Sequence, residues 1–155
     1  MELVIIRPVL VYGPGVKGNF QSMVRTVSRG IPLPLGGVTS NRRSLVALDN
    51  LVDVICTCVD HPRAAGQIFL VSDGEDLSTA DLLRRIAMVQ GVPARLLPVP
   101  PVLLLWIARL LGKEAVAQRL LGSLQVDITK TRELLNWQPP LTVNEGLKNL
   151  AEIRS

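Results

Sequence analysis

The sequence predicts an α/β fold. A continuous apolar run over residues 3–6, rich in β-branched side chains, has the character of a buried strand. Apolar residues at helical spacing follow over residues 20–29, and segments typical of strands and of helices then alternate to the end of the chain. No internal repeat interrupts this alternation.

The first half is predicted as strand, helix, strand, helix. Asn19 can cap the helix over residues 20–29, and Gly30 ends it. A proline-broken extended piece follows over residues 31–35, and a short strand over residues 44–48. Asp49 then caps a helix that continues to residue 60. The apolar residues expected to face inward on that helix are Leu51, Val52, Ile55, Cys58 and Val59.

The second half is predicted from clearer boundary signals. Ser78 with Asp81, and Thr142 with Glu145, form capping boxes that start two helices. Asp127 caps a third helix, which runs to residue 135. The remaining expected elements are strands over residues 67–71 and 95–98, a helix over residues 101–111 and a short helix to residue 121.

The position of the first strand bears on the extent of the protein. A buried strand needs neighbours, and the sequence supplies few, so we expect the 155 residues to be the back half of something larger. The first eleven residues lack the basic start of a signal peptide. The apolar run over residues 99–111 is too short to cross a bilayer, so no transmembrane segment is predicted.

Composition excludes several classes of site. Aromatic residues make up 3% of the chain, which argues against a stacking platform for single-stranded nucleic acid. A single histidine and two cysteines exclude a multi-histidine metal site and a disulfide framework. The net charge is +4, and thirteen of the 17 basic residues are arginine, whose guanidinium suits phosphate or carboxylate.

Most individual polar and aromatic residues have a structural interpretation. His61 follows a helix end, where a cationic side chain is favoured. The two cysteines are expected to pack as small hydrophobes. Trp106 and Trp137 are expected to fill the core or a groove.

Arg42 and Arg43 are the most informative pair. They follow a loop of small residues and enter the short strand over residues 44–48. An arginine held at the start of a strand suits the binding of a diphosphate. The alternative interpretation is that both arginines face solvent. No dinucleotide-binding glycine loop accompanies them, because Gly13-Pro14-Gly15 is too short and proline lacks an amide donor.

Six segments in order resemble the C-terminal half of the extended short-chain dehydrogenases/reductases, the NAD-dependent nucleotide-sugar epimerases and dehydratases. The segments are residues 7–15 (RPVLVYGPG), 18–20 (GNF), 33–36 (LPLG), 42–53 (RRSLVALDNLVD), 67–74 (QIFLVSDG) and 127–139 (DITKTRELLNWQP). The resemblance implies the last strands of a Rossmann-type sheet plus a small mixed α/β substrate-binding lobe. The dinucleotide-binding half and the catalytic Tyr/Lys pair would lie upstream, outside this chain.

The resemblance implies roles for particular residues. Residues expected to bind the nucleotide-sugar substrate are Asn19, Phe20, Leu33, Leu35, Arg42 and Ser123, with Arg42 on the diphosphate and the two leucines against the base. Pro8 and Tyr12 are expected on the side of the NAD cofactor. It further implies a cytoplasmic, homodimeric parent protein that binds no nucleic acid, with no catalytic residue and no metal ligand in this chain.

The family activity implied is a UDP-glucose 4-epimerase or a related dehydratase, in which NAD takes a hydride from the sugar and returns it. The chain alone is then expected to be inactive. It departs from the family pattern at Leu10, where many epimerases have Asn, and in the segment after Arg42, which lacks the usual Asp, aromatic and His. These departures bear on the substrate more than on the fold.

Two alternatives stay open. Leu10 and the apolar run over residues 99–111 also suit a reductase similar to hydroxysteroid dehydrogenases. The helix that contains Trp106, with Arg109 and Lys113 beside it, would also suit a non-enzymatic module that binds a membrane surface.

Overall fold

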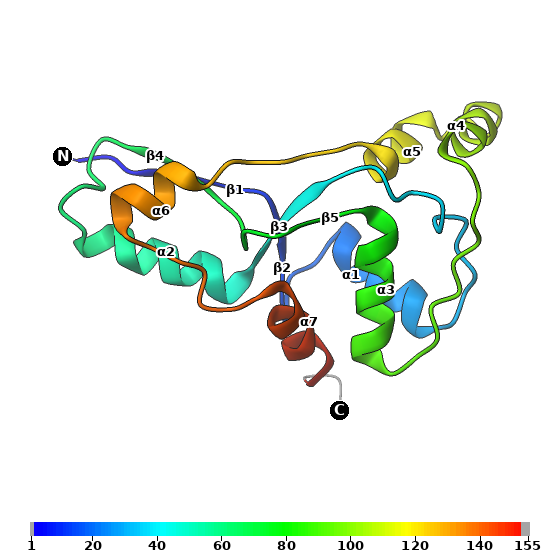
Figure 1. Cartoon of the computed structure of the whole chain (residues 1–155), viewed down its shortest axis with the longest axis horizontal. Coiled ribbons are helices and arrows are strands. Elements are labelled where there is room, and N and C mark those ends of the chain that lie inside the picture. The colour runs from blue at the N-terminus through cyan, green and yellow to red at the C-terminus, as the bar shows by residue number, and fades with distance from the viewer. Residues whose placement is uncertain (1, 153–155) are drawn as a thin grey trace. The chain divides into compact units, whose positions relative to one another are not determined.

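The computed structural model describes residues 2–152 and divides into two compact units, which are described separately (Figure 1). Unit 1 comprises residues 1–17, 44–76 and 125–155. Unit 2 comprises residues 18–43 and 77–124. The α/β class predicted from the sequence is confirmed, because strands and helices alternate along the chain.

Unit 1 contains short parallel strands. β1 (Ile5–Pro8) pairs in parallel with β4 (Ile68–Val71), and β2 (Leu10–Tyr12) pairs in parallel with β3 (Arg43–Ala47). The second sheet has the order β2-β3-β5, where β5 is Asp76–Leu77. Parallel strands need long crossover connections: residues 13–42 connect β2 to β3, and the longer segment that connects β1 to β4 includes the helix α2.

The first strand differs from the prediction of a buried central strand. It begins at Ile5, and its pattern of exposure is that of an edge: Arg7 and Pro8 are exposed and Ile6 is half-buried. The physical reason is that β1 pairs only with β4 among the described residues. A new strand, β2, follows after Val9 and enters the other sheet.

The helix α2 (Leu48–Asp60) forms as predicted, but its inward face was predicted correctly only in part. The buried residues are Asn50, Val54 and Cys58, which recur every fourth position. Val52, Ile55 and Val59 are exposed, although all three were expected to face inward. The helix has apolar residues on both sides, so periodicity alone could not choose the face. Asp49 lies in the first turn and does not cap the helix.

The core of unit 1 lies between α2, the strands and α6 (Thr129–Leu135). Trp137 is buried there, as predicted, and its indole Nε1 donates to the Asp53 carboxylate at 2.7 Å. The helix α7 (Val143–Glu152) begins at the predicted capping box, where the Glu145 amide donates to the Thr142 hydroxyl. Of the two cysteines, Cys58 is buried as expected and Cys56 is exposed.

Unit 2 is built on the helices α1 (Asn19–Ser28) and α3 (Thr79–Gln90), which contact each other. Ser78 caps α3 by accepting from the Asp81 amide at 3.1 Å, and Gly91 ends it in the left-handed conformation, both as predicted. The cap of α1 is Gly18, at φ 121°, rather than Asn19, which is the first residue of the helix.

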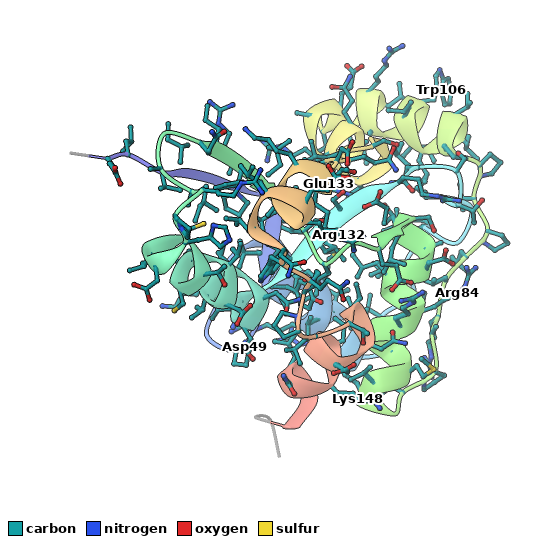
Figure 2. All side chains as sticks on the ribbon, turned by 60° about the vertical axis from the view of Figure 1, so that its left-hand side comes forward. Asp49, Arg84, Trp106, Arg132, Glu133 and Lys148 are labelled. Atoms are coloured by element: carbon teal, nitrogen blue, oxygen red, sulfur yellow. The ribbon has the colours of Figure 1, made fainter. Side chains whose placement is uncertain are left out.

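Two more helices of unit 2, α4 (Pro101–Leu110) and α5 (Glu114–Leu121), contact each other and have no fully buried residue. The expectation that Trp106 fills a core was wrong, since 61% of this residue is exposed. Figure 2 shows Trp106 pointing away from the α4 ribbon. Among the described residues, no helix is long and apolar enough to cross a membrane.

Candidate functional site

The structure brings two of the predicted substrate residues together in unit 2. The backbone amide of Arg42 donates to the Ser123 hydroxyl at 3.0 Å, and the Arg42 carbonyl accepts from the Leu124 amide at 2.9 Å. An isolated parallel bridge joins Arg43 to Leu124. The loop that holds Arg42 is therefore fixed against the segment after α5.

The Arg42 side chain is exposed and folds over its own loop. Its Nη1 donates to the carbonyl of Thr39 at 3.0 Å and to that of Asn41 at 2.9 Å. Both of the hydrogen bonds found for this guanidinium among the described residues use Nη1. Its Nε and Nη2 are thus the atoms that could meet an anion.

Asn41 anchors this loop, a role that the sequence did not reveal. It is 5% exposed, and its Nδ2 donates to the Thr79 hydroxyl at 2.8 Å and to the Gly122 carbonyl at 3.1 Å. Its Oδ1 accepts from the Thr79 amide at 3.0 Å. In the sequence, an asparagine in a polar loop predicts only a turn. Its anchoring role could not be recognised there, because its partners lie 38 residues or more away along the chain.

Arg43 has different surroundings from Arg42. It is the first residue of β3 and half-buried, and its Nη1 donates to the Arg119 carbonyl at 2.6 Å. This contact ties the strand entry to α5. Arg43 therefore has a structural partner, while Arg42 presents its side chain at the surface.

The other predicted substrate residues also lie in unit 2. Phe20 and Leu35 are buried, and Leu33 is half-buried. The Asn19 side chain lies outside the described residues. Leu33 bridges to Leu96, with its amide donating to the Arg95 carbonyl at 2.9 Å.

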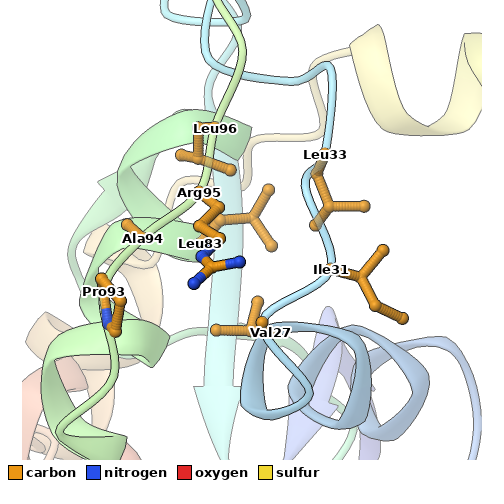
Figure 3. A pocket seen from close by; sticks show the side chains of 9 residues that line it. Val27, Ile31, Leu33, Leu83, Pro93, Ala94, Arg95 and Leu96 are labelled. Atoms are coloured by element: carbon orange, nitrogen blue, oxygen red, sulfur yellow. The ribbon is translucent and has the colours of Figure 1, made fainter.

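Leu33 and Arg95 line a small pocket together with residues of α1 and α3 (Figure 3). The pocket holds about 10 Å³ of solvent-accessible volume, which is room for about one water molecule. A nucleotide base does not fit inside it. A base that met the extended piece of residues 31–35 would therefore lie on its outer side.

A buried polar cluster fixes the end of β2 in unit 1. Tyr12 is fully buried, and its hydroxyl donates to Asp73 Oδ2 at 2.5 Å. Asp73 Oδ1 accepts from the Ala47 amide at 2.8 Å and from Asn50 Nδ2 at 2.7 Å. Asn50 also exchanges two hydrogen bonds with the backbone of Leu141, both at 2.9 Å.

Burial sets the electrostatics of this cluster. Desolvation raises the pKa of Asp73 above its ordinary value, while the hydrogen bonds from Tyr12, Ala47 and Asn50 act to lower it. The pKa of Tyr12 is strongly raised, first by desolvation and then by the neighbouring Asp73 carboxylate. The Tyr12 phenol is therefore neutral and acts as a donor, so it is unsuited to be a base.

Unit 1 has a cavity of about 330 Å³, which lies beside this cluster. Its lining residues include Asp73, Glu75, Arg132 and Thr142. Its volume is at the lower end of the range for small-molecule sites. None of the residues predicted from the sequence to bind substrate or cofactor lines it.

Charge is distributed unequally between the two units. Unit 2 contains ten of the basic residues and only two acidic ones, Asp81 and Glu114. Unit 1 contains the remaining seven basic and eleven acidic residues. The predicted substrate residues thus lie in the unit that is strongly positive, which favours anionic ligands.

Comparison with known proteins confirms the resemblance to extended short-chain dehydrogenases/reductases at the level of fold. A solved human epimerase family protein with NADPH superimposes with a TM-score of 0.74 at 18% identity, covering 96% of this chain and 48% of that one. A UDP-glucose 4-epimerase from Thermotoga maritima, solved with UDP-glucose, gives 0.66 at 20% identity, covering 95% and 44%. No family model matches the chain.

The sequence likeness is more specific. The chain is 55% identical to the UDP-glucose 4-epimerase of Vibrio cholerae over 152 residues, which are 98% of this chain and 46% of that protein. The chain therefore spans about half the length of the curated relatives it matches. It is similar to part of a UDP-glucose 4-epimerase.

Proposed function

We propose that this chain is the C-terminal, substrate-binding half of an NAD-dependent nucleotide-sugar 4-epimerase, or of a related dehydratase. The proposal rests on the 55% identity to a UDP-glucose 4-epimerase and on the placement of Arg42. That arginine is exposed, lies on a loop clamped by Asn41 and Ser123, and belongs to a unit with a large excess of positive charge.

Arg42 would bind the diphosphate, because its guanidinium fork matches two phosphate oxygens at once. Asn41 would hold the loop in place without touching the ligand. Residues 31–35 would lie along the base, and Asn19 and Phe20 would stand near the sugar nucleotide. Binding of the diphosphate in this way would aim the sugar at the cofactor.

NAD would be held mainly by residues outside this chain and would supply the hydride chemistry when bound. Pro8, exposed at the end of β1, is the residue of this chain that could meet it. Tyr12 would act indirectly, because its side chain is internal and fixes the end of β2 through Asp73. The chain alone would not turn over a nucleotide sugar, and turnover by the purified chain would contradict this part of the proposal.

Calorimetric titration of UDP-glucose into the unchanged protein and into its arginine variants tests the role of Arg42. A charge-assisted hydrogen bond contributes about 1.5–3 kcal/mol. Arg42→Ala should therefore weaken binding about 10- to 150-fold. Arg42→Lys should recover part of this loss, because lysine keeps the charge and loses the fork. Arg43→Ala should weaken binding much less than Arg42→Ala.

Arg84→Ala is the matched control for charge. It removes one positive charge from unit 2. Arg84 forms an ion pair with Asp81, in the first turn of α3. Binding should change less than about threefold in this variant, as for a surface ion pair. Equal losses for Arg42→Ala and Arg84→Ala would mean that net charge, and not the Arg42 site, attracts the ligand.

A further inference from the structure

The outward face of α4 is apolar without interruption. Its exposed residues are Val102, Leu103, Trp106, Ile107 and Leu110, at positions i, i+1, i+4, i+5 and i+8 of the helix. That spacing places them on one side. Leu104, Leu105 and Ala108 are half-buried on the other side. We call this set of five exposed side chains the α4 face.

The exposure of this face is large for residues of this kind. Val102 is 79% exposed, Leu110 is 69% exposed, and Leu111 continues the surface just beyond the helix. Single exposed apolar residues are ordinary, but a continuous apolar patch marks an interaction surface. Trp106 lies within the face, and tryptophan is the residue enriched where a bilayer meets water.

Basic residues border the α4 face. Arg109 adjoins it on the same helix, and Lys113 follows in the turn after it. Glu114, at the start of α5, pairs with Arg109 at 3.0 Å. With ten basic and two acidic residues, unit 2 is complementary to a negative surface and would repel a second copy of itself.

We propose that the α4 face docks unit 2 on a bilayer surface that contains anionic phospholipid. The helix would lie in the plane of the interface with Trp106 among the headgroups and Arg109 and Lys113 on lipid phosphates. The ten residues of α4 are far too few to span a bilayer, so the association is peripheral. This inference goes beyond the proposed function and does not depend on it.

Co-sedimentation of the purified chain with vesicles tests the proposal. Vesicles of phosphatidylcholine with phosphatidylglycerol should bind the chain, and vesicles of phosphatidylcholine alone should bind it at least tenfold less. Trp106→Gln and Leu110→Gln should each lower partitioning at least about tenfold. Lys113→Gln should lower it about fivefold.

Two equally exposed residues provide matched controls. Met88→Gln on α3 and Val59→Gln on α2 remove apolar side chains that are 67% and 76% exposed but lie outside the α4 face. Partitioning of both should stay within about twofold of the unchanged chain, because surface substitutions of this kind are nearly neutral. Binding of UDP-glucose should be the same in all four glutamine variants at apolar positions, which separates this test from that of Arg42.

Several outcomes would overturn the proposal. No binding to the anionic vesicles would do so. Equal binding to both kinds of vesicle would also do so, because the anionic bilayer is chosen as the partner on the basis of the positive charge of unit 2. If the chain does not bind vesicles but forms a concentration-dependent dimer that Trp106→Gln abolishes, the α4 face binds a second copy of the chain. Vesicle binding that disappears when the chain is part of a longer polypeptide would assign it to an internal interface.

Discussion

Removing the Tyr12 hydroxyl tests the buried cluster of unit 1 directly. The ring is fully buried, so Tyr12→Phe keeps the packing and deletes the hydroxyl, which donates to Asp73 at 2.5 Å and, over a longer 3.4 Å, to the Val143 carbonyl. A hydrogen bond to a charged group is worth about 1.5–3 kcal/mol. Asp73 retains its bonds from the Ala47 amide and the Asn50 side chain, so the carboxylate is not left unpartnered. The expected loss is therefore at the lower end, about 1.5–2 kcal/mol in the free energy of unfolding.

The loss should depend on pH with a definite sign. The Tyr12 hydroxyl stabilises the ionised form of Asp73 and so lowers its folded-state pKa relative to the variant that lacks the hydroxyl. That contribution is fully present above the Asp73 pKa and is lost as the pH falls through it. The difference in stability between the two proteins should thus shrink on acidification.

Urea unfolding, followed by far-ultraviolet circular dichroism between pH 7 and pH 4, is the appropriate assay. Thr57→Val is a matched control, because its hydroxyl donates to the Asp53 carbonyl at 2.9 Å on the exposed side of α2 in the same unit. It should change the free energy of unfolding by less than about 0.5 kcal/mol. A loss in Tyr12→Phe that equals the loss in this control, or that grows as the pH falls, would refute the reasoning.

Two further predictions concern packing and the loop anchor. Gly146→Ala in α7 should destabilise the protein by about 1–3 kcal/mol, although alanine normally favours a helix, because a Cβ there would lie 2.6 Å from the buried Tyr12 hydroxyl. Thermal unfolding measures the effect of the clash beside Lys148→Ala, which places alanine at an exposed position of the same helix, and an unchanged or raised melting temperature of Gly146→Ala would contradict the prediction. Asn41→Ala should lower the free energy of unfolding by about 2 kcal/mol, because it leaves the buried Thr79 amide unpaired. It should also weaken UDP-glucose binding, because the Arg42 loop loses its anchor. Urea unfolding measures the first effect and calorimetry the second, and unchanged affinity in a folded variant would show that the anchor does not affect the site.

Local signals predicted the helices well. The capping pairs Ser78–Asp81 and Thr142–Glu145 act within one turn, and both form the expected hydrogen bonds. The glycines after α3 and α4 take the left-handed conformation that ends a helix. Such features depend on neighbours a few residues away, so they can be recognised before the fold is known.

The candidate site could be predicted in part. The motif order pointed to Arg42 and Ser123, and the structure places them in contact. It did not reveal Asn41, because its partners come from α3 and from the segment after α5. The roles of these residues in binding a ligand stay predictions.

By itself, the sequence determined the α/β class, most helix boundaries, the arginine excess and the likeness to epimerases, since each follows from local spacing, composition or ordered motifs. Only the tertiary structure decided which side of α2 is buried, that Trp106 is exposed, and that Tyr12 meets Asp73 across 61 residues. The physical reason is that an apolar or polar side chain has no preferred partner until distant segments pack against it. The choice of face on an apolar helix, and the partners of a buried polar group, are therefore properties of the assembled fold.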